Sequence, residues 1–527
     1  MADPPPMTVD YSVYLVTDSR PAILAPGRRL AHVVDAALRG GATAVQLRDK
    51  LGSDADVAAQ ARELLGLTRA RGVPLLINDR VGVALEVGCE GVHLGQDDMD
   101  VAQARRMLGP GKIIGVSARS PAEAVAACDA GADYLGIGTV FSTTTRRKTD
   151  TATILGPAGV GAILAALAAA GHASVPTVAI GGIDAANAPA VLAHASAPRK
   201  PLDGLAVVSA IVAAADPAAA AARLLSAVLR ARVPLVVERV ARATPVSHNM
   251  TNLVVQNLAA NVALAVGASP IMANYALEAP DLAGLGGALV INMGTVTPEG
   301  LDNFVKALAA YNDAGRPVVL DPVGAGATAV RRDAVKKLLS AGTFAVIKGN
   351  ASEMLTVHSV ITADDQEHQR QPPREAQRGV DSTATLTITQ RAALARSIAR
   401  GRGRPCVAVV TGVSDIISDG RRTARVDNGH ELLGAITGSG CSLGTVLSAA
   451  VAAYEEDPFV AAVAATVMFG VAAEMAAARS DVRGPGTFVP AFIDELHAVR
   501  RATAERDWRW LALAKVEAIQ DDDAPVP

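Results

Sequence analysis

The first part of the sequence alternates short apolar runs, rich in Val, Ile and Leu, with segments of helical periodicity. Between the first two runs, the apolar residues from Leu30 to Leu38 repeat at helical spacing and stop at Gly40 and Gly41, which favours a helix end. Successive strand–helix units of this kind predict a (β/α)8 TIM barrel, with an open doubly wound sheet as the alternative. The eight runs are 14–18, 44–47, 75–77, 91–94, 112–117, 134–138, 177–180 and 204–209.

Polar residues or glycines follow nearly every one of these predicted strands. In a barrel the chemistry lies at the carboxyl ends of the strands, so their joint placement favours a functional role over separate loop or capping roles. They occupy 46–50, 78–79, 96–98, 117, 143–145, 181–182 and 209.

These residue types suit the binding of phosphate esters. Arg48 and Lys50 supply positive charge at one strand end, while Asp79 and Asp98 come from neighbouring strand ends and suit a shared Mg2+. The glycines at 181–182 follow the seventh strand, where bare backbone N–H groups of this fold bind phosphate. One anion site with a metal and one without predict two phosphorylated ligands.

The motifs of this half resemble those of thiamine-phosphate synthase, in order, over about residues 11 to 215. They read YLVTD, QLRDK, INDRV, GVHLGQDD, IIGVSA, GADYLGIGTVF, VAIGGI and GLAVVSAI. The resemblance implies an enzyme that joins a pyrimidine methyl diphosphate to a thiazole phosphate and releases pyrophosphate. No side-chain nucleophile is needed if the pyrimidine methylene acquires carbocation character.

The same resemblance implies a role for individual residues. The pyrimidine diphosphate would be held by Gln46, Arg48, Lys50, Asn78, Ser117 and Arg146. The thiazole phosphate would be held by Thr143, Thr145, Gly182, Val208 and Ser209, and Mg2+ by Asp79 and Asp98. Arg146 departs from the lysine usual in the family, which keeps the charge but changes its geometry. We interpret His93, inside a strand, as a structural histidine, and Cys89 and Cys128 as core residues.

At 527 residues the chain exceeds the size at which one hydrophobic core stops growing. Residues 216–232 are Ala- and Leu-rich with helical spacing, and they fit either the last barrel helix or the first helix of a second domain. We therefore predict an N-terminal domain over 1–230 and a C-terminal domain over 231–527.

The second half predicts a parallel α/β sandwich. Its short apolar strands lie at 288–292, 318–320, 345–347 and 406–410, with a helix over 254–265. The polar stretch 358–385 predicts an exposed insertion. The segment TGSGC at 437–441 precedes a helical pattern, so its backbone N–H groups suit the charge of a transferring phosphoryl group. A P-loop lysine is missing, which disfavours a Walker-type site.

Over about residues 235 to 515 the chain resembles hydroxyethylthiazole kinase of the ribokinase-like fold, through HNMTNLVVQNLAANVALAVGASPIM, INMGT, LDPVGAGAT, IKGNASE, VVTG and DNGHELLGAITGSGC. This implies transfer of the ATP γ-phosphate to the thiazole hydroxyethyl group. The thiazole would contact Met272 and Gly438, ATP would contact Arg331 and Thr411, and Asn350 and Glu353 would organise Mg2+. Cys441 stands where most of the superfamily has an aspartate base, and the helix N-terminus favours a lowered thiol pKa. The family kinases are trimers, so we expect a homo-oligomer, a trimer or a hexamer.

The net charge of −3 and the 3% aromatic content disfavour nucleic acid and anionic membranes as partners. The four cysteines form no CxxC pair, and no leader is evident, so we expect a cytoplasmic enzyme of small-molecule substrates. One alternative pairs a different phosphate-binding barrel with a sugar or pyrimidine kinase. Another makes one half an inactive sensing or oligomerisation module. Fusions in this order resemble those of fungi.

Overall fold

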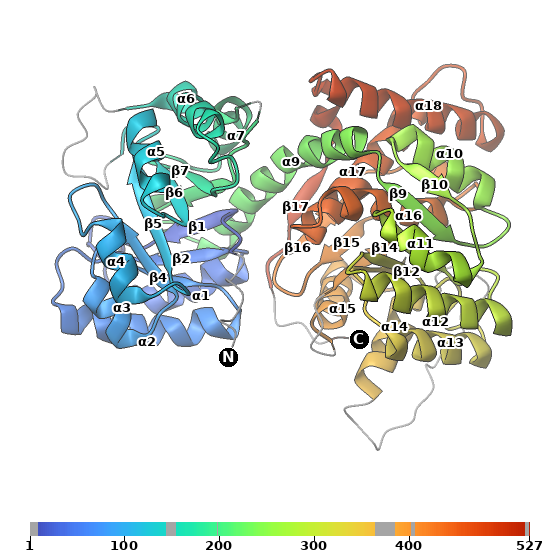
Figure 1. Cartoon of the computed structure of the whole chain (residues 1–527), viewed down its shortest axis with the longest axis horizontal. Coiled ribbons are helices and arrows are strands. Elements are labelled where there is room, and N and C mark those ends of the chain that lie inside the picture. Colours follow the sequence, from blue (N-terminus) through green and yellow to red (C-terminus); the bar gives the residue numbers. More distant parts are fainter. Residues whose placement is uncertain are drawn as a thin grey trace. The chain divides into compact units, whose positions relative to one another are not determined.

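The computed structural model describes residues 9–143, 154–197, 199–363, 385–401, 406–521 and 526. The chain forms two compact units, Met1–Ala231 and Arg232–Pro527. Helix α9, Pro217–Ala243, runs without a break through the point where the units divide (Figure 1). Residues 217–232, for which the sequence left two assignments open, belong to this one helix, which ends the first unit and begins the second.

The first unit is a closed barrel of eight parallel strands. Strand β1 pairs with both β2 and β8, which closes the sheet and confirms the barrel over the open-sheet alternative. The strands are β1 Val13–Val16, β2 Ala44–Leu47, β3 Leu75–Asn78, β4 Gly91–Leu94, β5 Ile113–Ala118, β6 Tyr134–Ile137, β7 Thr177–Ile180 and β8 Gly204–Val207.

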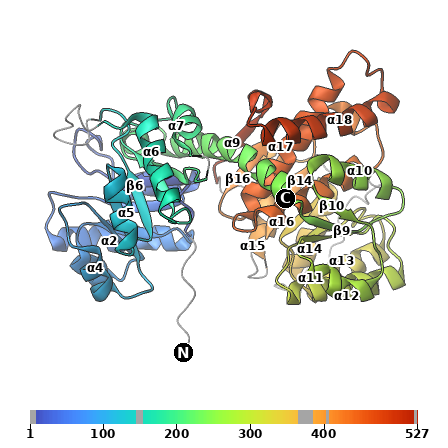
Figure 2. The ribbon, with the colours of Figure 1, turned by 45° about the horizontal axis from the view of Figure 1, so that its top comes forward.

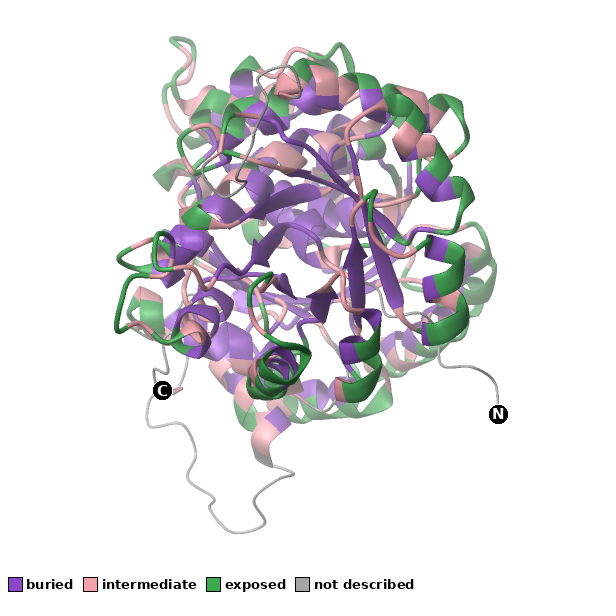
Figure 3. Ribbon diagram, turned by 90° about the vertical axis from the view of Figure 1, so that its left-hand side faces the viewer, coloured by how far each residue is buried: buried purple, intermediate pink, exposed green. Residues whose placement is uncertain are grey.

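Helices surround this barrel and turn their apolar sides to it, so that the strands are buried and the outer helix faces exposed (Figure 3). In α1 the buried residues Val33, Val34, Ala37 and Leu38 form one helical stripe. The barrel helices are α1 Leu30–Arg39, α2 Asp54–Ala70, α3 Val81–Val87, α4 Val101–Leu108, α5 Pro121–Asp129, α6 Gly156–Ala169, α7 Ala188–Ala195 and α8 Ser209–Val212.

The second unit is built on a nine-stranded sheet in the order β10-β9-β11-β12-β13-β14-β15-β16-β17. The pairs from β10 to β14 are parallel, and those from β14 to β17 are antiparallel. The strands are β9 Val246–Met250, β10 Ser269–Ile271, β11 Ala288–Asn292, β12 Val318–Asp321, β13 Val346–Asn350, β14 Val407–Thr411, β15 Asp415–Ser418, β16 Thr423–Val426 and β17 Val516–Ala518.

Helices cover both faces of this sheet, as the predicted sandwich requires (Figure 2). Those of one face, α11 to α15, share one apolar core with the strands, and α10, α16, α17 and α18 pack together on the other. Their bounds are α10 Gln256–Val266, α11 Ala279–Gly284, α12 Pro298–Asp313, α13 Ala329–Ala341, α14 Ala351–Ala363, α15 Ile388–Arg400, α16 Ser439–Ala453, α17 Pro458–Ala477 and α18 Pro485–Ala504.

Two details of the second half differ from or go beyond the sequence prediction. The predicted insertion at 358–385 begins too early, because residues up to Ala363 complete α14, and 364–384 lie outside the described residues. Among the described helices, α17 is long and apolar enough to cross a membrane, but 89% of its apolar window is buried. Its composition follows from its place between α16 and α18 in the core.

Candidate active sites

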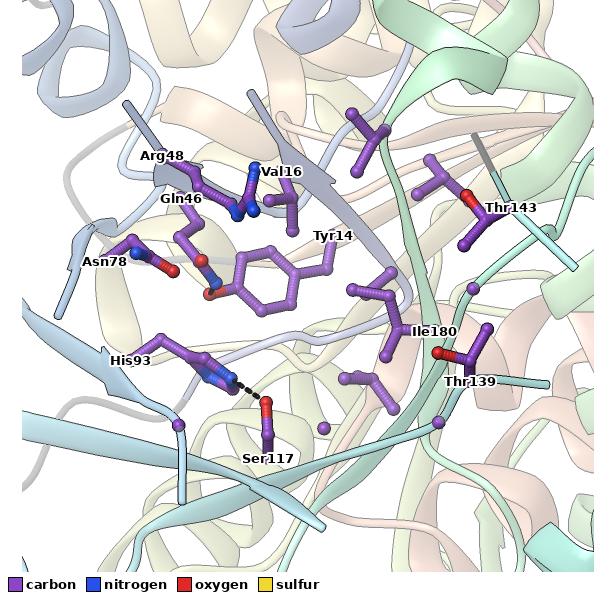
Figure 4. A pocket seen from close by; sticks show the side chains of 18 of the residues that line it. Tyr14, Val16, Gln46, Arg48, Asn78, His93, Ser117, Thr139, Thr143 and Ile180 are labelled. Atoms are coloured by element: carbon purple, nitrogen blue, oxygen red, sulfur yellow. Dashed lines mark hydrogen bonds between the residues drawn. The ribbon is translucent and has the colours of Figure 1, made fainter. Parts of the chain in front are cut away.

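A pocket of about 1150 Å³, including its open mouth, lies at the carboxyl end of the barrel strands. Every predicted barrel residue that the structure describes lines it. These are Gln46, Arg48, Lys50, Asn78, Asp79, Asp98, Ser117, Thr143, Gly182, Val208 and Ser209. The other two predicted residues, Thr145 and Arg146, lie outside the described residues. Figure 4 shows Arg48, Asn78 and Thr143 around the pocket.

The cationic side of the pocket is held by carboxylates. Lys50 Nζ lies 2.6 Å from an Asp79 carboxylate oxygen, and the Arg48 guanidinium lies 3.8 Å from Asp18. The Arg48 backbone N–H also donates to the Thr17 hydroxyl. Asp18 is buried and mainly binds Arg20, whose Nε donates to both of its carboxylate oxygens at 2.9 and 3.0 Å, so Arg48 lies at the edge of this ion pair. The sequence analysis gave Asp18 and Arg20 no role.

Asp79 and Asp98 face each other closely enough to hydrogen-bond. Burial opposes ionisation of Asp79, but the bond to Asp98 and the pairing with Lys50 lower its pKa. Burial and the neighbouring Asp79 raise the pKa of Asp98. Two carboxylates with one lysine leave excess negative charge, which a divalent cation would neutralise together with substrate phosphate, so the residues fit Mg2+.

The opposite side of the pocket offers backbone rather than charge. Gly181 and Gly182 have φ of 108° and 66°, in the left-handed region. A Cβ at Gly182 would lie 2.5 Å from the Ser142 carbonyl oxygen, so only glycine fits this turn. The adjacent 208–209 segment begins α8, and its N–H groups suit a phosphate.

His93, which we interpreted as a structural histidine, is buried and has both ring nitrogens in hydrogen bonds. It lines the pocket, and its Nε2 lies 2.9 Å from the Ser117 hydroxyl (Figure 4). Its Nδ1 lies 2.7 Å from the Tyr134 hydroxyl, inside the barrel. These contacts join residues 24 and 41 positions away from His93, so the sequence alone could not predict them.

In the second unit the segment predicted to form an anion hole lies at the start of α16. Gly438 is its N-cap with φ of 84°, and a Cβ there would lie 2.5 Å from a Val255 methyl group. The Lys348 ammonium donates to the Gly440 carbonyl at 3.0 Å and pairs with Asp321 at 3.1 Å. This buried ion pair therefore ties the end of β12 and strand β13 to the helix start.

Two asparagines, which the sequence analysis gave no role, extend this network. The Asn292 side-chain amide donates to the Asp321 carboxylate at 2.8 Å. The Asn252 side-chain amide donates to the side-chain oxygen of Asn292 at 3.0 Å. Asn252 also lies 3.6 Å from the Cys441 sulfur. Asn292 ends the apolar strand β11, the signal that marked other strand-end residues, whereas Asn252 follows the polar strand β9.

Cys441 lies in the first turn of α16, as expected, but its acidity differs from the expectation. Burial and the nearby Asp321 raise the pKa of the thiol to about 11, against the opposing effects of Lys348, Asn292 and Asn252. Burial therefore opposes the lowering that the helix N-terminus was expected to favour, and a pKa of about 11 keeps the thiol mainly protonated at physiological pH.

Asn350 and Glu353 form a reciprocal cap at the start of α14. The Glu353 carboxylate accepts from the backbone N–H of Asn350 and of Gly324, both at 2.8 Å, while Asn350 Oδ1 accepts from the Glu353 N–H. Burial and then Asp321 raise the pKa of Glu353 to about 7. Two carboxylates beside the single Lys348 again leave excess negative charge that suits a cation.

The remaining predicted kinase residues lie at other strand ends. Thr411 ends β14, and Met272 follows β10, three strands from β12 in the sheet. The Arg331 guanidinium donates to three backbone carbonyls, those of Met293, Val323 and Gly294, at 2.6–2.9 Å. It thus joins the loops after β11 and β12.

The structure defines a class of protein: a (β/α)8 barrel with a polar pocket at the carboxyl ends of its strands, followed by an α/β/α domain with a glycine-rich helix start. Two family models match the corresponding halves. Thiamine monophosphate synthase matches residues 13–211, and the hydroxyethylthiazole kinase family matches residues 237–502.

Relatives match over nearly the whole chain. A probable thiamine biosynthetic bifunctional enzyme of Schizosaccharomyces pombe is 37% identical, over 97% of this chain and 99% of its own. The thiamine biosynthetic bifunctional enzyme of Saccharomyces cerevisiae is 35% identical, over 95% and 97%. A thiamine-phosphate synthase of Chloroflexus aurantiacus is 50% identical over 41% of this chain and 92% of its own. The chain belongs to the bifunctional thiamine biosynthetic enzymes, in which a thiamine-phosphate synthase is fused to a hydroxyethylthiazole kinase.

Proposed function

We propose that the C-terminal domain phosphorylates 4-methyl-5-(2-hydroxyethyl)thiazole with ATP. The barrel then joins the thiazole phosphate to 4-amino-2-methyl-5-(diphosphooxymethyl)pyrimidine, giving thiamine phosphate and pyrophosphate. The observation that carries this proposal is the gathering of all the described barrel site residues in one pocket, with cations and carboxylates on one side and glycine backbone on the other.

In the barrel, Arg48, Lys50 and Asn78 bind the diphosphate and hold it as it departs with the bonding electrons. Asp79 and Asp98 would hold Mg2+, which supplies charge neutralisation for that leaving group. Gln46 and Ser117 contact the pyrimidine, and Arg146 adds charge. The pocket walls exclude water from the electron-poor methylene so that the thiazole nitrogen forms the new C–N bond.

The thiazole phosphate binds on the opposite side of the pocket. The backbone of Gly182, Val208 and Ser209 donates to its oxygens, and Thr143 and Thr145 add hydroxyl contacts. Anchoring the phosphate there orients the ring nitrogen toward the methylene of the pyrimidine, which lowers the entropic cost of the reaction.

In the kinase domain, the N–H groups from Gly438 onward stabilise the charge on the transferring phosphoryl group. Cys441 contacts the thiazole hydroxyl, and Met272 contacts the ring. Arg331 and Thr411 contact ATP. Asn350 and Glu353 would organise Mg2+, which supplies charge neutralisation at the ATP phosphates.

We also propose that the chain forms a trimer or hexamer through its kinase domain. Leu253 and Leu277 are exposed by 72% and 69%, and they follow the neighbouring parallel strands β9 and β10. Exposed aliphatic side chains at one sheet edge suit a subunit contact. Light scattering after chromatography should give a multiple of the chain mass in wild type and a smaller one in Leu277→Lys.

One assay tests both activities in purified full-length protein. Thiazole alcohol, ATP, Mg2+ and pyrimidine diphosphate are supplied together, and thiamine phosphate, ADP and pyrophosphate are followed. Asp79→Ala should stop at thiazole phosphate, while Cys441→Ala should form thiamine phosphate once thiazole phosphate is supplied. Wild type that releases ADP but makes no thiamine phosphate, even from supplied thiazole phosphate, would refute the synthase proposal.

A further inference from the structure

A continuous chain of hydrogen bonds crosses the interior of the barrel between two pocket residues. Gln46 Nε2 donates to the Tyr14 hydroxyl at 2.8 Å, and the Tyr14 and Tyr134 hydroxyls lie 2.7 Å apart. The Tyr134 hydroxyl lies 2.7 Å from His93 Nδ1, and His93 Nε2 lies 2.9 Å from the Ser117 hydroxyl. We name these five residues the relay.

Each internal member of the relay has one hydrogen to give, so the direction of one bond sets the next. The Tyr14–Tyr134 and Tyr134–His93 bonds can each run in either direction. With Gln46 donating to Tyr14, each buried hydroxyl hydrogen has an acceptor only if Tyr14 donates to Tyr134 and Tyr134 donates to His93 Nδ1. His93 then carries its hydrogen on Nε2 and donates to Ser117. The opposite polarity requires the Gln46 amide to be turned and every other hydrogen to reverse.

The two ends of the relay are therefore coupled. In the polarity that the Gln46 amide sets, its carbonyl oxygen is free to accept from a ligand, and the Ser117 hydrogen is free to be donated. Reversal would offer the ligand an amide N–H from Gln46 and only lone pairs from Ser117. The hydrogen bonds of Tyr134 and His93 inside the barrel thus help to keep the Gln46 oxygen available as an acceptor for the ligand.

We propose that Tyr134 and His93 are positioning residues of the synthase that fix Gln46 as an acceptor and Ser117 as a donor. This inference rests on the proposed function, in which the ligand is an aminopyrimidine. The exocyclic amine donates to the Gln46 carbonyl, and the oxo analogue, which has an acceptor at that position, is rejected because two acceptors face each other.

The barrel backbone is shaped around the two rings at the centre of the relay. A Cβ at Gly115 would lie 2.0 Å from the Tyr134 ring, and one at Gly136 would lie 3.1 Å from His93 Cε1. Tyr134 is fully buried, so a hydroxyl deprived of its partners there would have no water to replace them. Gly115 and Gly136 therefore leave the space that the Tyr134 and His93 rings occupy inside the barrel.

The tautomer of His93 tests the polarity directly and without substrate. Full-length protein labelled with 15N-histidine is examined by NMR, and His93 is assigned by its loss in His93→Gln. The expected result is a hydrogen on Nε2 and a lone pair on Nδ1. A hydrogen on Nδ1 would overturn the inference, whether or not the enzyme makes thiamine phosphate.

Tyr134→Phe tests the consequence for recognition, with Tyr11→Phe as the matched control. Tyr11 packs on Tyr134 with ring centroids 4.6 Å apart, but among the described residues its hydroxyl makes none of the relay bonds. The ratio of kcat/KM for the amino substrate to that for its oxo analogue should fall at least about tenfold in Tyr134→Phe and stay unchanged in Tyr11→Phe.

An unchanged ratio in folded Tyr134→Phe would overturn the inference. If that variant fails to fold by circular dichroism, the His93 tautomer in wild type decides the question. Failure of wild type to make thiamine phosphate would instead refute the proposed function, because the tautomer measurement does not depend on turnover.

Discussion

The neutral state of the Cys441 thiol can be measured through its reactivity toward iodoacetamide, which alkylates only the thiolate. Burial and Asp321 raise its pKa to about 11 from an ordinary value of 9.0. At pH 8 the thiolate fraction is then ~0.1% rather than ~10%, so alkylation should be roughly a hundredfold slower than for an unperturbed thiol. Tryptic peptides quantified by mass spectrometry separate Cys441 from the other three cysteines.

The matched variant is Asp321→Asn. It removes the charge that helps raise the pKa of Cys441 and leaves the Lys348 ammonium, which lowers it. Alkylation of Cys441 at pH 8 should therefore accelerate at least about tenfold. A wild-type rate that reaches half of its maximum near pH 7 to 8 would refute the reasoning, because it would mean that the helix N-terminus outweighs burial.

The same state has a consequence for catalysis. A neutral thiol can hydrogen-bond the thiazole hydroxyl but is a poor general base, so Cys441→Ser should keep kinase kcat/KM within about tenfold of wild type. If the thiolate is the base, the serine variant should lose on the order of a thousandfold, since a hydroxyl ionises far less readily.

Three further changes give separable outcomes. Asp98→Asn should raise the Mg2+ concentration needed for pyrophosphate release at least about tenfold and leave ADP formation by the kinase unchanged, since it removes one of two paired carboxylates. The folded pKa of Glu353, about 7, lies above its ordinary 4.5, so its contribution to stability is full below about pH 4.5 and is lost as the pH rises through 7. Glu353→Gln should remove up to about 3 kcal/mol of this pH dependence, measured by denaturant unfolding at pH 5 and 8. Gly115→Ala should cost about 1–3 kcal/mol through overlap with Tyr134, whereas Gly66→Ala, with nothing within 4 Å, should cost none in the same thermal unfolding experiment.

Much of both folds was predictable because parallel strands that are buried on both faces have continuous apolar sequences. All eight barrel strands and four strands of the second sheet were predicted in this way. Strand β9 was not, because its sequence VSHNM carries three polar side chains. Each of these is paired inside the protein, as when Ser247 bonds Ser448, 201 positions away. Tertiary pairing thus overrides the local pattern.

Some residues of the candidate sites could likewise be predicted from the sequence, and others could not. Residues at strand ends were found from their place in the chain, because the fold brings those ends together. The contacts of His93 were missed, since they depend on partners far away in sequence. The pKa of Cys441 could not be predicted, because the sequence shows the helix start but not the depth of burial or the nearby Asp321.

The two sites use one electrostatic arrangement at different depths. In each, two carboxylates share one lysine. In the barrel, burial and then Asp79 raise the pKa of Asp98, and in the kinase burial raises the pKa of both Asp321 and Glu353. Each site therefore favours a cation that arrives with a phosphorylated ligand. The lysines differ, because Lys50 is 52% exposed and Lys348 only 5%. Lys50 can exchange Asp79 for an incoming diphosphate at little cost, whereas Lys348 is bound on both sides and serves to hold the kinase site together.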